Sequence, residues 1–360
     1  MMNRLTDDLV TDILSRLVIK TLMRCRCVCK LWRNLARDPR FIHSHLNNRS
    51  SQRSPSFILS TTIWFDSAFR SQIYFLEHDE TLGYSCEEVS FSVPDLKEFR
   101  LISSCNGLFC LVHRMCRNII YVCNPFTRCC TKLPNRINPS QNILGTIMGF
   151  GFNPKRNEYK VVEVVHCSGS AMASEFHSRV YVHTLGDGSW RGKGYVPCLI
   201  PREPASSEAF VCGALHWLCL SPAKQIAFFD ITNEAFGFIP FPEIAVGGGG
   251  GSLSLALMDG CLSITGSAFH DHIDLWIMKD YGVKESWVKS FSICFNQVMW
   301  NNFQTPCIQG NGELLMLYKN QALFSYSPRT MTLRKLRIAG LPSWFEMVNH
   351  VGSLVSVSGR

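Results

Sequence analysis

At 360 residues the chain is long enough to bury a large core and has room for one to three domains. Its composition, 46% hydrophobic and 18% charged, excludes a wholly disordered protein, and no apolar run approaches the roughly 18 residues of a membrane-spanning helix. The net charge of +8 is uneven, because residues 1–53 carry 11 Lys and Arg against 4 Asp and Glu, a net charge of +7. This basic segment would suit nucleic acid or an acidic protein partner.

The N-terminus and the cysteines indicate a reducing compartment. Asp7 and Asp8 lie where a secretory signal needs a continuous apolar stretch, so we expect the protein in the cytoplasm, the nucleus or both. The 17 cysteines include no Cys-x-x-Cys pair, and many lie in apolar runs such as Leu108–Val112. We therefore expect free thiols that act as small buried hydrophobic groups, with no disulfide framework.

The first predicted element is an amphipathic helix. Thr6 is a suitable N-cap, and two aspartates follow it in the first turn, where negative charge meets the helix dipole favourably. The helical spacing of apolar residues predicts the apolar stripe of an amphipathic helix. Its members are Leu5, Leu9, Ile13, Leu14 and Leu17.

A second helix is predicted from Thr21 to Leu35. Along one side it would carry Leu22, Cys25, Val28, Cys29, Trp32 and Leu35. On a continuous helix Cys27 would point about 200° away from Cys25, so three thiolates would not converge on one metal ion. After Asp38 and Pro39 a short last piece contains His43 and His45, which lack a third ligand nearby. We expect no metal site in this segment.

The sequence from Leu5 to Leu46 contains DDLVxxIL, RLxxKxLxRCRxVxKLW and DPRFI. In these features it resembles an F-box, the three-helix module with which substrate receptors bind the Skp-family adaptor of cullin ubiquitin ligases. Thr6 and Val18 stand where that family usually has prolines. The resemblance implies that the module's core and adaptor face are shared among Leu5, Leu9, Ile13, Leu14, Leu17, Leu22, Val28 and Trp32. The alternative is a helical hairpin that packs on the protein's own C-terminal domain.

The domain boundaries follow from a change of composition. Residues 1–46 are predicted as the helical module, residues 47–56 as a linker with no apolar side chain before the next domain, and residues 57–360 as a β-rich domain. In the β-rich part short β-branched and aromatic runs alternate with turn residues.

The β-rich part repeats. Glycine-led strand units begin at Gly107, Gly213, Gly260 and Gly312, and the first step of 106 residues is twice a period near 50. That period predicts five units, and the pieces at the two ends of the domain can combine into a sixth. The fold class is therefore mainly β with a small α N-terminal module, predicted as a three-helix F-box followed by a six-bladed β-propeller. A β-sandwich is the alternative.

Further motifs of the β-rich part are SCNGLFCLV, NPFTRCCTKLP, GFGFNPKRNEYKVV, GALHWL and FDITNEAFGFIPFPE. Over residues 57–345 these resemble the F-box-associated, kelch-like domain of plant F-box proteins. The resemblance implies that loops on one rim recognise another protein. Together the two resemblances imply a substrate-recognition subunit of a Skp–cullin–F-box ligase, whose unidentified target is ubiquitinated and then degraded by the proteasome.

No motif predicts catalysis by this chain. The run Gly247–Ser252 lacks the lysine of a phosphate-binding loop, and His270 and His272, which flank Asp271, lack a further ligand. His216 is interpreted as a core or rim residue. We expect no catalytic residue, cofactor, metal or membrane partner. Nucleic-acid binding by the basic N-terminal segment remains the alternative function, although its aromatic residues, Trp32 and Phe41, are few for base stacking.

Overall fold

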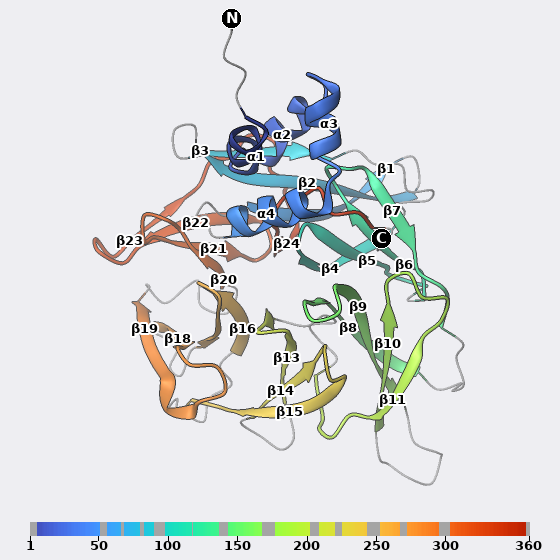
Figure 1. Cartoon of the computed structure of the whole chain (residues 1–360). Helices are drawn as coiled ribbons and strands as arrows, with labels where there is room; N and C mark the ends of the chain where they lie inside the picture. The colour runs from blue at the N-terminus through green and yellow to red at the C-terminus, as the bar shows by residue number, and fades with distance from the viewer. Residues whose placement is uncertain are drawn as a thin grey trace, which may run out of the picture. The chain divides into compact units, whose positions relative to one another are not determined.

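A computed structural model gives the arrangement of the elements (Figure 1). It contains four N-terminal helices and six four-stranded sheets in the parts of the chain described below. Two compact units are present: residues 1–133 together with 347–360, and residues 134–346. The described residues are 6–50, 56–65, 68–79, 83–89, 98–116, 118–136, 143–167, 177–201, 209–219, 225–242, 253–266, 272–294 and 303–357.

The helical module of the first unit consists of short helices around one small core. The helices are α1 (Asp7–Ser15), α2 (Ile19–Cys25), α3 (Lys30–Leu35) and α4 (Pro39–Ser50). Thr6 is the N-cap residue of α1, as predicted, although its hydroxyl makes no capping hydrogen bond. Buried apolar side chains of this core are Val10, Leu14, Ile19, Leu22, Ala36, Phe41 and Leu354.

The prediction of one continuous helix from Thr21 to Leu35 is wrong. Helix α2 ends at Cys25, where the N–H of Cys27 donates to the carbonyl of Arg24 and that of Val28 to the carbonyl of Cys25, each at 3.0 Å. Cysteine and valine are weak helix formers, and in a continuous helix Arg26 and Lys30 would be like charges one turn apart. A tight turn therefore replaces the middle of the helix, so the module has four helices, not three.

Helix α4 extends further than the short last piece predicted after Pro39. It continues to Ser50, so the first four residues of the predicted linker are helical, and strand β1 begins at Ser56. Buried His45 on α4 has its Nε2 2.9 Å from the carbonyl oxygen of Leu17. This contact fixes α4 against the chain that connects α1 to α2.

The first unit also contains two sheets. The first sheet has the order β24-β1-β2-β3, and residues from the two ends of the chain meet in it, as predicted for the sixth blade. The N–H of His350 donates to the carbonyl of Ser56 at 2.9 Å. The strands are β1 (Ser56–Phe65), β2 (Ala68–Asp79), β3 (Gly83–Glu88), β24 (Glu346–Asn349), β4 (Phe99–Cys105), β5 (Leu108–His113), β6 (Ile120–Asn124) and β7 (Cys129–Lys132).

The second unit holds four sheets, and each consists of strands consecutive in the chain. The first has β8 (Ile143–Asn153), β9 (Glu158–Cys167), β10 (His177–Thr184) and β11 (Arg191–Tyr195), and the next β12 (Ala209–Val211), β13 (Ala214–Leu218), β14 (Gln225–Asp230) and β15 (Ala235–Pro240). The third has β16 (Leu253–Met258), β17 (Cys261–Gly266), β18 (His272–Met278) and β19 (Trp287–Cys294), and a 3-10 turn, Lys284–Ser286, directly precedes β19. The last has β20 (Phe303–Ile308), β21 (Leu314–Tyr318), β22 (Ala322–Ser327) and β23 (Thr332–Lys335).

The repeated glycines lie at the turn between the first two strands of a sheet. Gly107, Gly213 and Gly260 have φ values of 82°, 77° and 77°, and the residue before each also has a positive φ. Two consecutive positive φ values define the two-residue type I′ hairpin, in which glycine avoids the steric cost of a side chain. The period recognised in the sequence is therefore a period of hairpins.

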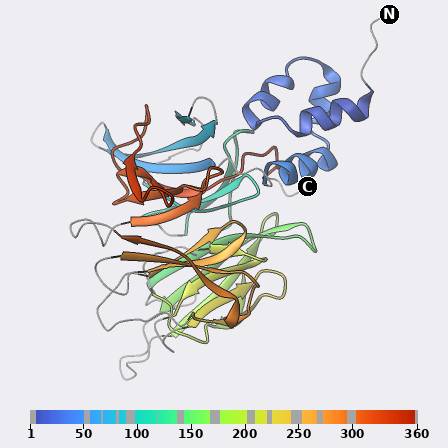
Figure 2. The ribbon, with the colours of Figure 1, turned by 90° about the vertical axis from the view of Figure 1, so that its left-hand side faces the viewer.

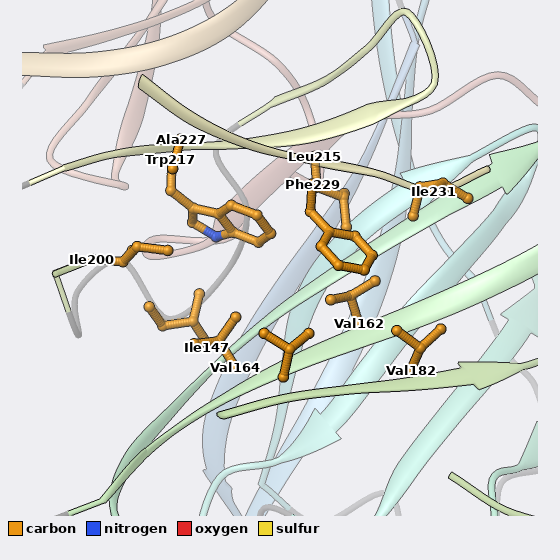
Figure 3. Close-up of a cluster of buried hydrophobic side chains, with 11 residues drawn as sticks. Ile147, Val162, Val164, Val182, Ile200, Leu215, Trp217, Ala227, Phe229 and Ile231 are labelled. Atoms are coloured by element: carbon orange, nitrogen blue, oxygen red, sulfur yellow. The ribbon is translucent and has the colours of Figure 1, made fainter. Parts of the chain in front are cut away.

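The hydrophobic core of each unit lies between neighbouring sheets. In the second unit Val162 and Val164 of β9 face Phe229 of β14 and Trp217 of β13 (Figure 3). All four are at most 1% exposed. Burying both faces of each sheet against its neighbours is the packing of propeller blades, so the six four-stranded sheets confirm the predicted fold class, a mainly β six-bladed propeller after an α module.

One pair of cysteines forms a disulfide, contrary to the expectation of free thiols. Cys123 on β6 and Cys130 on β7 are directly opposite each other, their Cα atoms are 4.1 Å apart, and their sulfur atoms are bonded. Direct cross-strand pairing brings the two Cβ atoms together, which sequence separation alone did not indicate. None of the described helices has the length and apolar character required to cross a membrane.

Candidate functional site

The structure divides the predicted adaptor-binding residues by exposure. Leu14 and Leu22 are 2% and 1% exposed and belong to the core of the module, while Leu17 and Trp32 are half-buried at its edge. Leu5 lies outside the described residues. The exposed members are Leu9, Ile13 and Val28, at 51%, 48% and 65%.

Helix α1 shows how this exposure arises. Leu9 and Ile13 are four residues apart and share one face, whereas Val10 and Leu14, one position further along, point into the core. The apolar arc of α1 is thus wider than the module itself covers. Exposed leucine and isoleucine beside a small core are typical of a surface that a partner covers.

Sequence reasoning missed two exposed apolar residues of the module. Leu31, on α3, is 51% exposed, and Val18, the N-cap residue of α2, is 39% exposed. Leu31 was overlooked because a continuous helix would have placed the apolar stripe through Val28 and Trp32. The break after Cys25 rotates α3 relative to a continuous helix, so different side chains face outward. In the sequence this break is indicated only by a run of weak helix formers.

The module is packed directly on the rest of the first unit (Figure 2). Ile19 of α2 lies against Gly352, where an added Cβ atom would be 2.5 Å from the Ile19 Cγ2 atom and 2.9 Å from the ring of Phe126. Lys20 forms an ion pair with Glu87 of β3 at 3.0 Å. The helices therefore hold a fixed orientation on the sheets of this unit.

The far ends of these two sheets present aromatic and apolar side chains. Trp64 on β1 is 64% exposed and packs edge-to-face with Phe69 on β2, with ring centroids 4.7 Å apart. Met115, after β5, is 77% exposed. Ser56, at the opposite end of β1, bonds to the C-terminal segment, and Trp64 is eight residues, or about 26 Å of strand, away.

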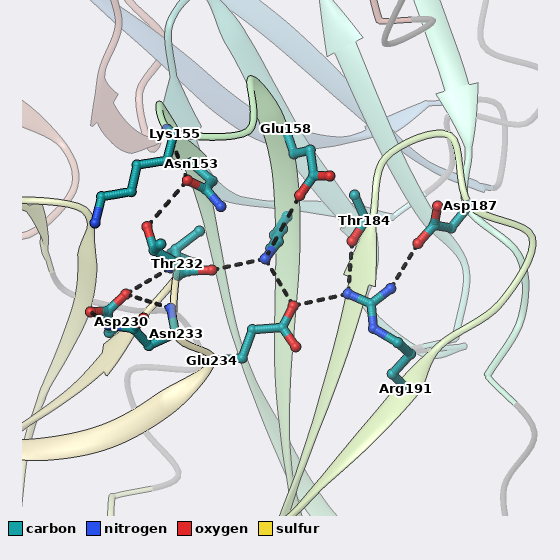
Figure 4. A network of polar contacts seen from close by, with 12 residues as sticks. Asn153, Lys155, Glu158, Thr184, Asp187, Arg191, Asp230, Thr232, Asn233 and Glu234 are labelled. Atoms are coloured by element: carbon teal, nitrogen blue, oxygen red, sulfur yellow. Dashed lines mark hydrogen bonds and ion pairs between the residues drawn. The ribbon is translucent and has the colours of Figure 1, made fainter.

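A cluster of charged and polar side chains lies in the second unit (Figure 4). The Glu234 carboxylate accepts from Lys160 Nζ at 2.8 Å and from Arg191 at 2.9 Å, and it also pairs with Lys193. Although burial opposes ionisation, these cations lower the pKa of Glu234 to about 2. A carboxylate that is already satisfied by three cations is a poor proton acceptor, so the cluster joins β9 to the β14–β15 turn rather than providing a general base.

The surroundings of His216 and His272 indicate structural roles. His216 is fully buried, its Nε2 is 2.8 Å from the hydroxyl of Tyr281, and burial lowers its pKa to about 4. His270 and Asp271 lie outside the described residues, while His272 is 3.6 Å from Asp274, which also pairs with Lys289 at 2.7 Å. Within the described ranges no group of three His, Cys, Asp or Glu residues is placed to hold a metal ion.

Comparison with known families gives two matches to this chain. Residues 2–44 match the F-box domain, and residues 62–357 match the F-box associated beta propeller domain. The chain belongs to the F-box proteins that carry this propeller. The family match covers both the helical module and the six-sheet region of this F-box protein.

Two curated relatives of this F-box protein are from Arabidopsis thaliana. F-box protein At3g07870 is 30% identical over 97% of this chain and 91% of its own length. F-box protein CPR1 is 26% identical over 97% of this chain and 88% of its own length. Among solved structures, an oligogalacturonate lyase in complex with manganese aligns at 9% identity over 77% of this chain and 73% of that chain, with a TM-score of 0.44, which is too low to support an argument.

Proposed function

We propose that this F-box protein is the substrate-recognition subunit of a Skp–cullin–F-box ubiquitin ligase and works in the cytoplasm, the nucleus or both. The observation that carries the proposal is the exposed apolar pair Leu9 and Ile13 on the first helix of an F-box. A Skp-family adaptor would cover this pair together with Val28 and Leu31 and connect the chain to a cullin. The residues named as adaptor-binding that are buried, Leu14 and Leu22, would then support the surface from beneath.

The chain would contribute proximity to the reaction. Holding a target near a ubiquitin-charged enzyme raises the effective concentration of the target's lysines, and the reactive cysteine belongs to that other enzyme. No catalytic residue is required of the receptor. The ubiquitinated target would then be degraded by the proteasome.

A protein target would bind at the ends of the sheets that face away from the helical module. Trp64, Phe69 and Met115 support this assignment, because exposed aromatic and methionine side chains are enriched in the centres of protein interfaces. They lie at the ends of their sheets opposite to the segment that contacts the helices. Affinity purification with the proteasome blocked, comparing the wild type with Trp64→Ala, would identify a target and test this position.

The adaptor-binding proposal is tested with Leu9→Lys and Ile13→Lys, measured by calorimetric titration with a recombinant Skp-family adaptor. A charge placed at a desolvated contact costs several kcal/mol, so each variant should weaken binding by roughly 100-fold or more. Met331→Lys, at a residue that is 78% exposed in the β22–β23 turn, is the matched control and should bind as the wild type does. Leu14→Lys is unsuitable, since Leu14 lies in the core.

The salt dependence separates adaptor binding from the nucleic-acid alternative. Binding through Leu9 and Ile13 should persist between 50 and 200 mM salt because it rests on apolar burial. Binding that neutralises several phosphates should fall by about 10³-fold or more over that range. Unchanged adaptor affinity in both lysine variants would refute the proposed surface.

A further inference from the structure

A cavity of about 700 Å³ lies in the first unit, between the helical module and the neighbouring strands and turns. Helices α2 and α3 and the turns after them form one side, and the end of β3 and the β6–β7 turn form the other. Two carboxylates, Glu87 and Glu88, line it. The cations that line it are Lys20, Arg24, Arg26, Arg33, Arg37 and Arg128.

Most of this positive charge has no carboxylate partner among the residues that the structure describes. Lys20 is engaged by Glu87 at 3.0 Å and Glu77 at 3.8 Å. None of the five arginines forms an ion pair with a carboxylate in the described part of the chain. The Nε of Arg33 donates instead to the carbonyl of Arg26 at 3.3 Å, which holds two of the guanidinium-bearing segments together.

This arrangement favours an anionic ligand. Like charges held around one concavity raise the local positive potential, and a bound anion relieves their repulsion. The preponderance of arginine indicates phosphate, because the planar guanidinium donates two parallel hydrogen bonds to phosphate oxygens. One acidic side chain, Glu87, is already paired with Lys20, so it opposes such a ligand less than a free carboxylate would.

The dimensions and the remaining lining indicate a small molecule. A volume of about 700 Å³ is in the range of small-ligand pockets, roughly 300–1,000 Å³. Met23, Val89 and Phe126 give the cavity an apolar wall, which can hold an uncharged scaffold beside the charged groups. We propose that this cavity binds a small molecule that carries two or more phosphate groups.

The ligand would connect two parts of the first unit. Arg24, Arg33 and Arg37 belong to the helical module, whereas Arg128 belongs to the β6–β7 turn. A polyphosphate bound by both would hold the module on the sheets and stabilise the folded state by mass action. The adaptor-binding residues Leu9 and Ile13 do not line the cavity, so the site is separate from the proposed adaptor surface.

The test is calorimetric titration of the full chain with inorganic tripolyphosphate at 150 mM salt. A parallel titration with sulfate at the same ionic strength is the reference. Saturable binding of one tripolyphosphate per chain is expected. Arg37→Gln and Arg128→Gln should each weaken it by roughly tenfold to 100-fold, because each removes a charge-assisted hydrogen bond. Arg40→Gln, an exposed arginine of α4 outside the cavity, is the matched control and should bind as the wild type does.

Several results would overturn the proposal. It fails if tripolyphosphate shows no saturable binding, or if Arg40→Gln weakens binding as much as the two cavity variants. A macromolecular ligand would also overturn it. That result would be an RNA duplex or an acidic phosphopeptide that binds the cavity variants less tightly than the wild type and is not displaced from the wild type by tripolyphosphate. Circular dichroism melting of each variant establishes that it is folded, and Arg128, in a strand turn, provides an independent variant should Arg37→Gln unfold the helices.

Discussion

The carboxylate of Glu234 lies among three cations, and one of them, Lys160, has a side chain that is 2% exposed. Glu234 itself has a positive φ of 53° in the β14–β15 turn, so the turn geometry directs its side chain toward β9. Lys160 also donates to the carbonyl oxygen of Ile231 at 2.9 Å. The buried ammonium is therefore stable only while this carboxylate remains charged and in place.

Glu234→Gln should lower the free energy of unfolding by about 3 kcal/mol, since it leaves a buried lysine without its main counter-charge. Urea unfolding measures the change, and Glu285→Gln, at an exposed residue, is the control. The pKa of Glu234 is lowered to about 2, so its contribution is present above the ordinary glutamate pKa near 4.5 and is lost as the pH falls toward 2. The difference between variant and wild type should therefore disappear at low pH; a constant difference would contradict the ionic explanation.

At the scale of single elements, the hairpins were more predictable than the helices. Each repeated glycine carries a strong local signal, because Gly107 or Gly260 occupies a conformation that other residues adopt at a steric cost. The break between α2 and α3 has only a weak sequence signal, since Cys27 and Val28 disfavour a helix only slightly. Helical spacing within α1 was enough to place Leu9 and Ile13 on one face. The orientation of Leu31 depends on the break between α2 and α3, so its exposure could not be predicted from the sequence.

The segment after β24 is the element that joins the helices to the sheets. Gly352 leaves no room for a Cβ atom beside Ile19 and Phe126. Leu354 belongs to the core of the helical module, and Ser353 Oγ donates to the carbonyl of Asn106 at 2.8 Å. Local periodicity could not have revealed these contacts, because their partners are more than 200 residues apart in the chain.

Gly352→Ala should destabilise the protein by about 1–3 kcal/mol through overpacking against Ile19 and Phe126. Hydrogen exchange should locate the effect, with faster exchange in residues 7–46 than in the wild type. Gly188→Ala is the control, since a Cβ atom there would meet no atom within 4 Å. Equal effects of the two substitutions would show that the cost is not one of packing.

At the scale of the whole molecule, residues from both ends of the chain complete the first unit. The last strand, β24, lies beside β1, and Leu354, near the end of the chain, completes the core beneath α1 and α2. Pairing of the chain ends in one sheet was predictable, because five units of period near 50 left strand segments at the two ends of the domain that could combine into a sixth unit. The packing of the same C-terminal segment against the helices was not, since it rests on the side-chain contacts of Leu354 and Gly352.

This interdependence predicts the outcome of a truncation that removes residues 351–360. The shortened chain keeps strand β24 but loses Leu354 and the donor Ser353, so the helical module loses part of its core, a change that costs about 2–5 kcal/mol for a buried leucine alone. Amides of residues 7–46 should then exchange close to the rate of an unfolded chain, and adaptor binding should weaken although Leu9 and Ile13 are intact. Amides of residues 143–167 belong to the second unit and serve as the internal control, because none of their own core residues is removed. Unchanged protection of the helices would mean that the module is stable without the C-terminal segment, and the F-box would then act as an autonomous domain rather than as a part of the first unit.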